Sequence, residues 1–152
     1  ISMIWCNIVC IYIFYEICVC QSVCKIELCE WIKVDFLDVR WIFYFDSLSA
    51  TMLIVINVIS LCAQIYSIEY MRDDPHNIRF FSYLSLFTFF MVFLVLSDNL
   101  LQLFMGWEGV GICSYLLINF WSTRIQANKA SILAVMTNKV GDLALLLCCA
   151  IC

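Results

Sequence analysis

Long apolar stretches alternate with short polar joints along the whole chain. Residues 47–68 and 80–97 contain no charged side chain. At 1.5 Å per residue, a helix of about 20 residues crosses a hydrocarbon core of about 30 Å, so both stretches have roughly the length of a membrane span. Inside lipid each backbone polar group must find its partner within its own segment, so we predict helices. Three further stretches are as long but contain isolated charges: residues 1–24 with Glu16, 99–123 with Glu108, and 130–152 with Lys139 and Asp142.

The pattern predicts an all-α fold, a polytopic membrane helical bundle segment with about five transmembrane helices. Residues 25–45 differ, because they are amphipathic and rich in Trp, Val, Phe and Tyr. We expect this segment to lie at the membrane interface as a strand pair or a short helix, with its aromatic side chains at headgroup level. The predicted transmembrane helices cover residues 1–24, 46–70, 79–97, 99–121 (carrying GWEGVG) and 127–152 (carrying Lys139 and Asp142).

Composition agrees with a membrane protein and excludes several other classes. The 152 residues are 65% apolar and only 13% charged, with a formal net charge of −4. A soluble domain has about a quarter of its residues charged, so an ordinary soluble globule and a disordered tail are both excluded. No basic patch is present to follow phosphates, which excludes a nucleic-acid binder.

The chain has eleven cysteines, most of them inside apolar runs, where a thiol acts as a small hydrophobic side chain. The nearest approach to a metal-ligand cluster is Cys18, Cys20, Cys24 and Cys29. Paired Cys-x-x-Cys units are absent there, so we expect neither a metal nor an iron–sulfur site. GWEGVG follows no predicted strand, so it is not a phosphate-binding loop. We expect no cofactor on this chain.

A charged side chain inside a span indicates a functional or structural role, because its insertion at the bilayer centre costs at least about 2.5–3.5 kcal/mol. Glu108 lies near mid-membrane, beside Gly106, Gly109 and Gly111, which allow another backbone to approach closely. Intramembrane carboxylates usually mark ion or proton paths, so Glu108 is a candidate proton-translocating residue. The alternative is a buried ion pair that only fixes helix register.

The other intramembrane charges have weaker implications. Lys139 and Asp142 are three residues apart and share a helix face, so they can neutralise each other. A helix-stabilising pair and a proton relay both fit this spacing. Glu16 lies two-thirds along its stretch, and we expect it to reach the interface by snorkelling.

Basic residues give a modest indication of orientation. Because five helices alternate sides, Lys25, Lys33 and Arg40 share one side with the turn at Asp98. The positive-inside rule favours the opposite side facing the cytosol or the mitochondrial matrix. That opposite side carries Arg72, Arg79, Arg124 and Lys129.

GWEGVG at residues 106–111, followed by ICSYLLI, closely resembles subunit 5 of respiratory NADH:ubiquinone oxidoreductase (complex I), a family of antiporter-like proton-pumping subunits. The resemblance runs from residue 45 to the end of the chain. Other matching pieces, in the same order, are FDSLS at 45–49, the joint at 70–84, SDNLLQL at 97–103 and NKVGD at 138–142.

This resemblance implies that Glu108 pairs with a lysine on a later helix, and that Lys139 and Asp142 take part with it in proton translocation or electrostatic coupling. It implies the N-terminal part of a split or truncated distal subunit in the mitochondrial inner membrane. FMN, iron–sulfur clusters and ubiquinone are then expected on partner subunits, where NADH is oxidised. The expected partners are the remaining fragment of the same subunit in trans, other complex I membrane subunits and membrane lipids, but no nucleic acid.

Two other functions stay open on the sequence. One is a fragment of an Mrp-type cation/proton antiporter subunit, which would lie in a bacterial plasma membrane. The other is a structural membrane subunit that does not pump. The presence of Glu108, Lys139 and Asp142 at membrane depth counts against the structural subunit, because apolar residues would cost less there.

Overall fold

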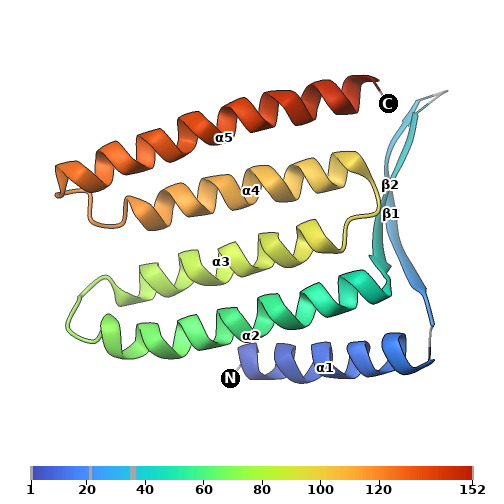
Figure 1. Ribbon diagram of the computed structural model, residues 1–152, viewed down its shortest axis with the longest axis horizontal. Coiled ribbons are helices and arrows are strands. Elements are labelled where there is room, and N and C mark those ends of the chain that lie inside the picture. Colours follow the sequence, from blue (N-terminus) through green and yellow to red (C-terminus); the bar gives the residue numbers. More distant parts are fainter. Residues whose placement is uncertain (1, 21, 35–36, 152) are drawn as a thin grey trace.

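The computed structural model describes residues 2–20, 22–34 and 37–151, and this part of the chain contains five long helices and one β-hairpin (Figure 1). Each helix is long and apolar enough to cross a membrane, which confirms the predicted fold class. In chain order the elements are α1 (Ser2–Cys20), β1 (Cys24–Val34), β2 (Leu37–Phe45), α2 (Ser47–Tyr70), α3 (Asn77–Val95), α4 (Leu100–Ile118) and α5 (Ile125–Ile151).

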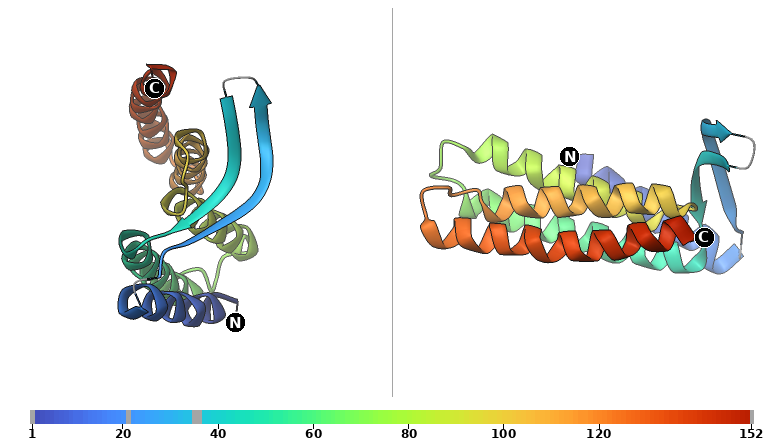
Figure 2. Two further views of the ribbon diagram at one scale, coloured as in Figure 1. Left: turned by 90° about the vertical axis from the view of Figure 1, so that its right-hand side faces the viewer. Right: turned by 90° about the horizontal axis from the view of Figure 1, so that it is seen from above.

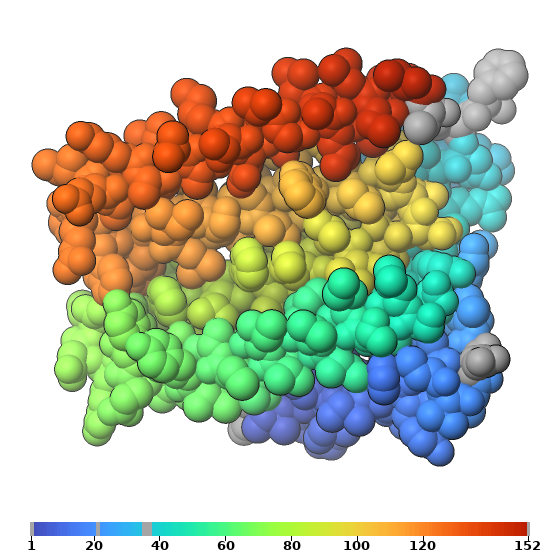
Figure 3. Space-filling model, viewed as in Figure 1, coloured from blue at the N-terminus to red at the C-terminus, as the bar shows by residue number. Residues whose placement is uncertain are grey.

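The helices stand side by side in chain order, and successive helices run in opposite directions (Figure 1). α1 packs on α2, α2 on α3, α3 on α4, and α4 on α5. Seen from the hairpin end, the helices form an open row and not a closed ring (Figure 2). α5 therefore forms one edge of the molecule (Figure 3). Within the described part of the chain, α4 is the main neighbour of α5.

Helix boundaries differ from the predicted ones by a few residues. α1 ends at Cys20 and not at residue 24, because Cys24 already pairs with Phe45 of the second strand. α3 begins at Asn77, two residues before the predicted start, and α5 begins at Ile125. The first turn of a helix can consist of polar residues at the membrane surface, so apolar patterning alone does not locate where a helix begins.

The interfacial segment is an antiparallel hairpin, so the strand pair is the correct alternative for residues 25–45. It stands at one end of the helix row, across the turn between α3 and α4 (Figure 2). The Tyr44 N–H donates to the Leu96 carbonyl at 3.0 Å, and Asn99 Nδ2 donates to the Arg40 carbonyl at 2.8 Å. Lys25 Nζ lies 3.9 Å from Asp98 Oδ2, so both lie at the same end of the row.

A polar contact joins α1 to α2 about midway along the lengths of the two helices. Asn57 Nδ2 donates to Cys10 Sγ at 2.8 Å and to the Leu53 carbonyl at 3.1 Å. Asn7 Nδ2 donates to the Asn57 carbonyl at 3.4 Å. Hydrogen bonds of this kind hold helices together in lipid. Cys10 is thus a hydrogen-bond acceptor as well as an apolar side chain, a role that the sequence did not indicate.

α2 begins with a capping box formed by Asp46 and Ser49. Asp46 Oδ1 accepts a hydrogen bond from the Ser47 N–H at 2.7 Å, and Ser49 Oγ accepts one from the Asp46 N–H at 2.6 Å. The cap provides partners for backbone N–H groups that the helix itself cannot satisfy. It also fixes the point at which the chain passes from the hairpin into the second span.

We expect Asp46→Ala to destabilise the chain by about 1 kcal/mol, because it removes this cap. Thermal unfolding in detergent, followed by helical circular dichroism, measures the change. Asp73→Ala is the control, since Asp73 is an exposed carboxylate in the turn between α2 and α3. Equal melting temperatures for the two variants would show that the capping box adds nothing to stability.

Candidate functional site

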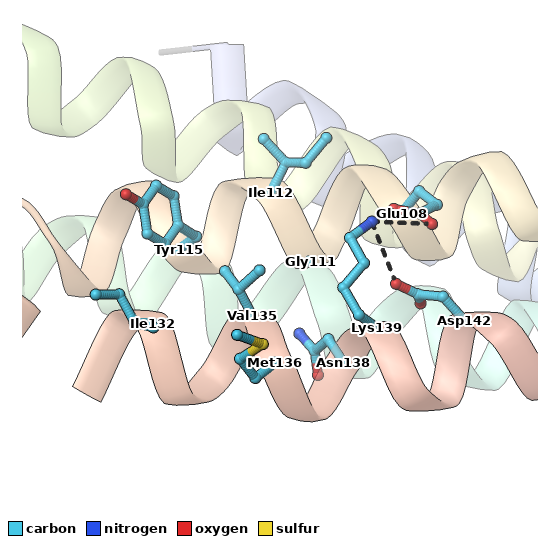
Figure 4. A pocket seen from close by; sticks show the side chains of 10 residues that line it. All are labelled: Glu108, Gly111, Ile112, Tyr115, Ile132, Val135, Met136, Asn138, Lys139 and Asp142. Carbon is cyan, nitrogen blue, oxygen red and sulfur yellow. Dashed lines mark hydrogen bonds and ion pairs between the residues drawn. The ribbon is translucent and has the colours of Figure 1, made fainter. Parts of the chain in front are cut away.

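The three charged residues singled out in the sequence form one cluster between α4 and α5 (Figure 4). Lys139 Nζ lies 3.2 Å from Glu108 Oε2 and 3.6 Å from Asp142 Oδ2. The contact with Asp142 lies within α5, at the three-residue spacing noted in the sequence. The contact with Glu108 crosses from α5 to α4, so one lysine serves two carboxylates.

The glycines around Glu108 set the rotation of α4. A Cβ atom on Gly106 would lie 2.9 Å from Cα of Leu94, and one on Gly109 would lie 2.6 Å from Cγ of Phe90. Both glycines therefore face α3 and let the two helices approach closely. Gly111 lies on the opposite side, where its Cβ would stand 3.6 Å from Asn138 of α5.

This rotation turns Glu108 towards α5. With α3 held against the glycine face, the Glu108 carboxylate points at Lys139 across the helix interface (Figure 4). The glycines thus do more than the sequence suggested, because they decide which neighbouring helix the carboxylate meets.

A cavity of about 360 Å³ opens beside the cluster between α4 and α5 (Figure 4). Its charged wall consists of Glu108, Lys139 and Asp142, whose side chains are 27%, 61% and 10% exposed. Two carboxylates share one ammonium group, so the cluster carries a net charge of −1 when all three are ionised. The rest of the wall is largely apolar, which strengthens electrostatic interactions inside it.

Sequence reasoning missed Tyr115 and Asn138, which also line this cavity. A signal for Tyr115 was present, because it follows Glu108 by seven residues and so lies on the same face of α4. Asn138 precedes Lys139 directly and was quoted only as part of a motif. Tyr115 lies at the end of the cavity remote from the ion pairs, and its hydroxyl points away from them (Figure 4).

Other candidate residues lie away from the cluster. Glu16 accepts a hydrogen bond from the Tyr12 hydroxyl on the exposed side of α1, at the far edge of the row from α5. Within residues 2–20, 22–34 and 37–151, no group of three His, Cys, Asp or Glu side chains is placed to hold a metal ion.

Comparison with known proteins gives two family matches. Residues 31–81 match the family described as NADH-ubiquinone oxidoreductase (complex I), chain 5 N-terminus. Residues 97–152 match the family described as NADH:quinone oxidoreductase/Mrp antiporter, TM, a description that names two of the functions considered from the sequence.

Individual relatives agree with the first of these two functions. NADH-ubiquinone oxidoreductase chain 5 of Marchantia polymorpha is 57% identical over 134 residues, which cover 88% of this chain and 20% of the relative. The protein of the same name from Acanthamoeba castellanii is 53% identical over 142 residues, 93% of this chain and 21% of the relative. That from Arabidopsis thaliana is 54% identical over 134 residues, 88% of this chain and 20% of the relative.

The chain belongs to the NADH-ubiquinone oxidoreductase chain 5 family. It spans about a fifth of the length of the chain 5 relatives that it matches. The resemblance seen in the sequence is thereby confirmed. These relatives are eukaryotic, and the described helices include five candidate spans, so the chain is a multi-pass protein of the mitochondrial inner membrane. The bacterial plasma membrane is not supported.

Proposed function

We propose that the chain is the N-terminal part of the distal proton-translocating membrane subunit of complex I, which couples NADH oxidation by ubiquinone to proton pumping. The observation that carries this proposal is the Glu108–Lys139–Asp142 cluster on adjacent helices of a chain 5 family member. Charged groups at this depth are costly and usually serve ion or proton movement.

The proposed mechanism is electrostatic. Lys139 beside Glu108 favours the ionised carboxylate, and displacement of Lys139 lets the carboxylate accept a proton. Two unit charges about 4 Å apart attract by about 4 kcal/mol at an effective dielectric constant of about 20. Displacement of the cation removes this attraction, which the solvent exposure of Lys139 reduces, from beside the Glu108 carboxylate. Asp142 remains as a partner for the Lys139 ammonium group when Glu108 is protonated.

We further propose that this chain carries no redox site, and that it contributes to an oxidoreductase through its partners. FMN, the iron–sulfur clusters and bound ubiquinone then belong to other complex I subunits. Further helices of the same subunit, carried by a partner polypeptide in trans, complete the translocation path. Other complex I membrane subunits and membrane lipids surround the chain, and we infer no nucleic-acid partner.

Glu108→Gln is expected to at least halve the number of protons translocated per NADH oxidised while assembly of the complex stays near normal. The substitution keeps side-chain size and removes the ionisable group. Proton uptake by vesicles containing the intact complex, divided by the rate of NADH oxidation, measures this ratio. Glu16→Gln is the matched control, because Glu16 lies on α1 away from the cluster.

Two other outcomes would favour other functions. Loss of assembly with an unchanged proton ratio in the remaining complex would mean that Glu108 only fixes helix register. Cation-dependent proton exchange without NADH oxidation would favour the antiporter, which the description of the second family also names.

A further inference from the structure

The two ends of the helix row differ in how their cations are neutralised. At the hairpin end, Arg40 contacts the carboxylates of Glu27, Glu30 and Asp38. Its hydrogen bonds to Asp38 lower the pKa of that carboxyl group. The remaining hairpin cations are also paired, Lys25 with Asp98 and Lys33 with Glu30.

The opposite end carries cations without such partners. We call residues 121–129, which comprise the end of the α4–α5 connection and the first five residues of α5, the basic turn (Figure 1). Arg124 and Lys129 are exposed, and no carboxylate of the described chain lies within 4.0 Å of either. The sequence between Glu108 and Asp142 contains no acidic residue at all. The basic turn therefore has a local excess of two positive charges.

Aromatic rings fix the level of the basic turn relative to the bilayer. The Arg124 guanidinium lies 5.9 Å from the centre of the Trp121 ring, and Trp121 packs edge-on against Tyr70 at 6.0 Å. Trp and Tyr gather at the headgroup level of membranes. A guanidinium beside this Trp is therefore expected at the depth of the lipid phosphates.

Arg79, in the first turn of α3 at the same end, is a third cation with no carboxylate partner in the described chain; its Nε donates to the Tyr83 hydroxyl at 2.7 Å. The rings of Phe80 and Phe120 are in edge contact at 5.2 Å, which joins the first turn of α3 to the connection that follows α4. Arg79 precedes Phe80 and lies against the Tyr83 ring at 5.5 Å, with no carboxylate of the described chain within 4.0 Å. The acids at this end are Glu69, which pairs with Arg72, and Asp73 and Asp74 on the neighbouring turn between α2 and α3.

We propose that the basic turn binds the headgroup of an anionic phospholipid. Arg124 offers paired N–H donors that match a phosphate, and Lys129 adds a point charge. The exposed hydroxyl groups of Ser122 and Thr123 are further donors in the same turn. Basic groups beside spans on the matrix or cytoplasmic side attract anionic lipids, and this is the side that the positive-inside rule assigns to the basic turn.

The test uses the full chain reconstituted in phosphatidylcholine vesicles that contain a trace of spin-labelled lipid. Electron paramagnetic resonance measures the fraction of label immobilised at the protein surface. We expect spin-labelled phosphatidylglycerol to be immobilised more than spin-labelled phosphatidylcholine. The double variant Arg124→Gln with Lys129→Gln should lose at least half of this excess, and high salt should weaken the excess in the wild type.

Arg72→Gln is the matched control, because Arg72 lies at the same end but is already paired with Glu69 at 3.4 Å. It should keep the full preference for the anionic lipid. Equal immobilisation of both labels by the wild type, or an equal loss in the control and the double variant, would overturn the proposal. Circular dichroism verifies the helix content of each variant. If the double variant misfolds, Arg124→Lys replaces it as the test: this variant keeps the positive charge and should retain the preference for phosphatidylglycerol. The measurement involves no proton translocation, so its result is independent of the role proposed for Glu108.

Discussion

Replacing Lys139 with methionine is expected to destabilise the chain more than any other single change in the cluster. Lys139 is the shared partner of Glu108 and Asp142, so its loss leaves two carboxylates unpaired in a low-dielectric site. Removing one partner of a fully buried pair costs about 3–5 kcal/mol. Lys139 is 61% exposed, so we expect about 2 kcal/mol, measured as a loss of thermal stability in detergent.

The matched comparison is the triple variant Glu108→Gln, Lys139→Met and Asp142→Asn, which has no charge left in the cluster. It should be more stable than Lys139→Met alone, because no ionised group is left without a partner. A triple variant that is less stable than the single one would show that the ion pairs themselves stabilise the helix contact. The double replacement of Lys139 and Asp142, which removes both charges that α5 contributes to the cluster, still leaves Glu108 unpaired and should be tolerated poorly.

Gly109→Leu is expected to separate α3 from α4 and to lower stability by about 1–3 kcal/mol or more, the range for overpacking a close contact. Even a Cβ atom at this position would lie 2.6 Å from Cγ of Phe90. Because the same contact sets the direction of Glu108, the variant should also weaken the pairing with Lys139. Thermal unfolding of the purified chain measures the first effect, and proton translocation by the assembled complex reports the second.

The control for helix propensity is Gly141→Ala, since a Cβ atom on Gly141 has no neighbour within 4 Å. That change should be neutral or stabilising, because Ala favours helix over Gly by roughly 1 kcal/mol. A second variant, Gly109→Ala with Phe90→Ala, should be more stable than Gly109→Ala alone, because it removes the clashing ring. If Phe90→Ala brings no such recovery, the contact with α3 does not decide the cost at Gly109.

The sequence alone was sufficient to identify the spans and the candidate charges. The membrane spans can be predicted because an uncharged apolar stretch of about 20 residues matches the bilayer thickness, and in lipid it must form a helix to satisfy its backbone polar groups. Glu108 stands out for the same reason, since a carboxylate at that depth is costly. The pairing of Lys139 with Asp142 follows from helical spacing within one element.

The sequence did not identify the partner of Glu108. Lys139 is 31 residues away and on a different helix, and no local spacing rule connects them. The helices are apolar on most sides, so hydrophobic periodicity does not reveal which face of α4 meets α5. The strand pair at residues 25–45 was also left open against a short helix, because its amphipathic pattern suits both.

The sequence by itself thus determined the number of spans, the membrane setting, the family and the three charged residues. It did so because few backbone structures are stable in hydrocarbon, and because a charged side chain inside an apolar span is costly and easy to recognise. Only the tertiary structure decided that Glu108 and Asp142 share one lysine, and that Arg124 and Lys129 stand without a carboxylate. These pairings depend on the rotation and depth of each helix. In lipid, close packing of small residues such as Gly106 and Gly109 against Leu94 and Phe90 sets that rotation, while hydrophobicity does not.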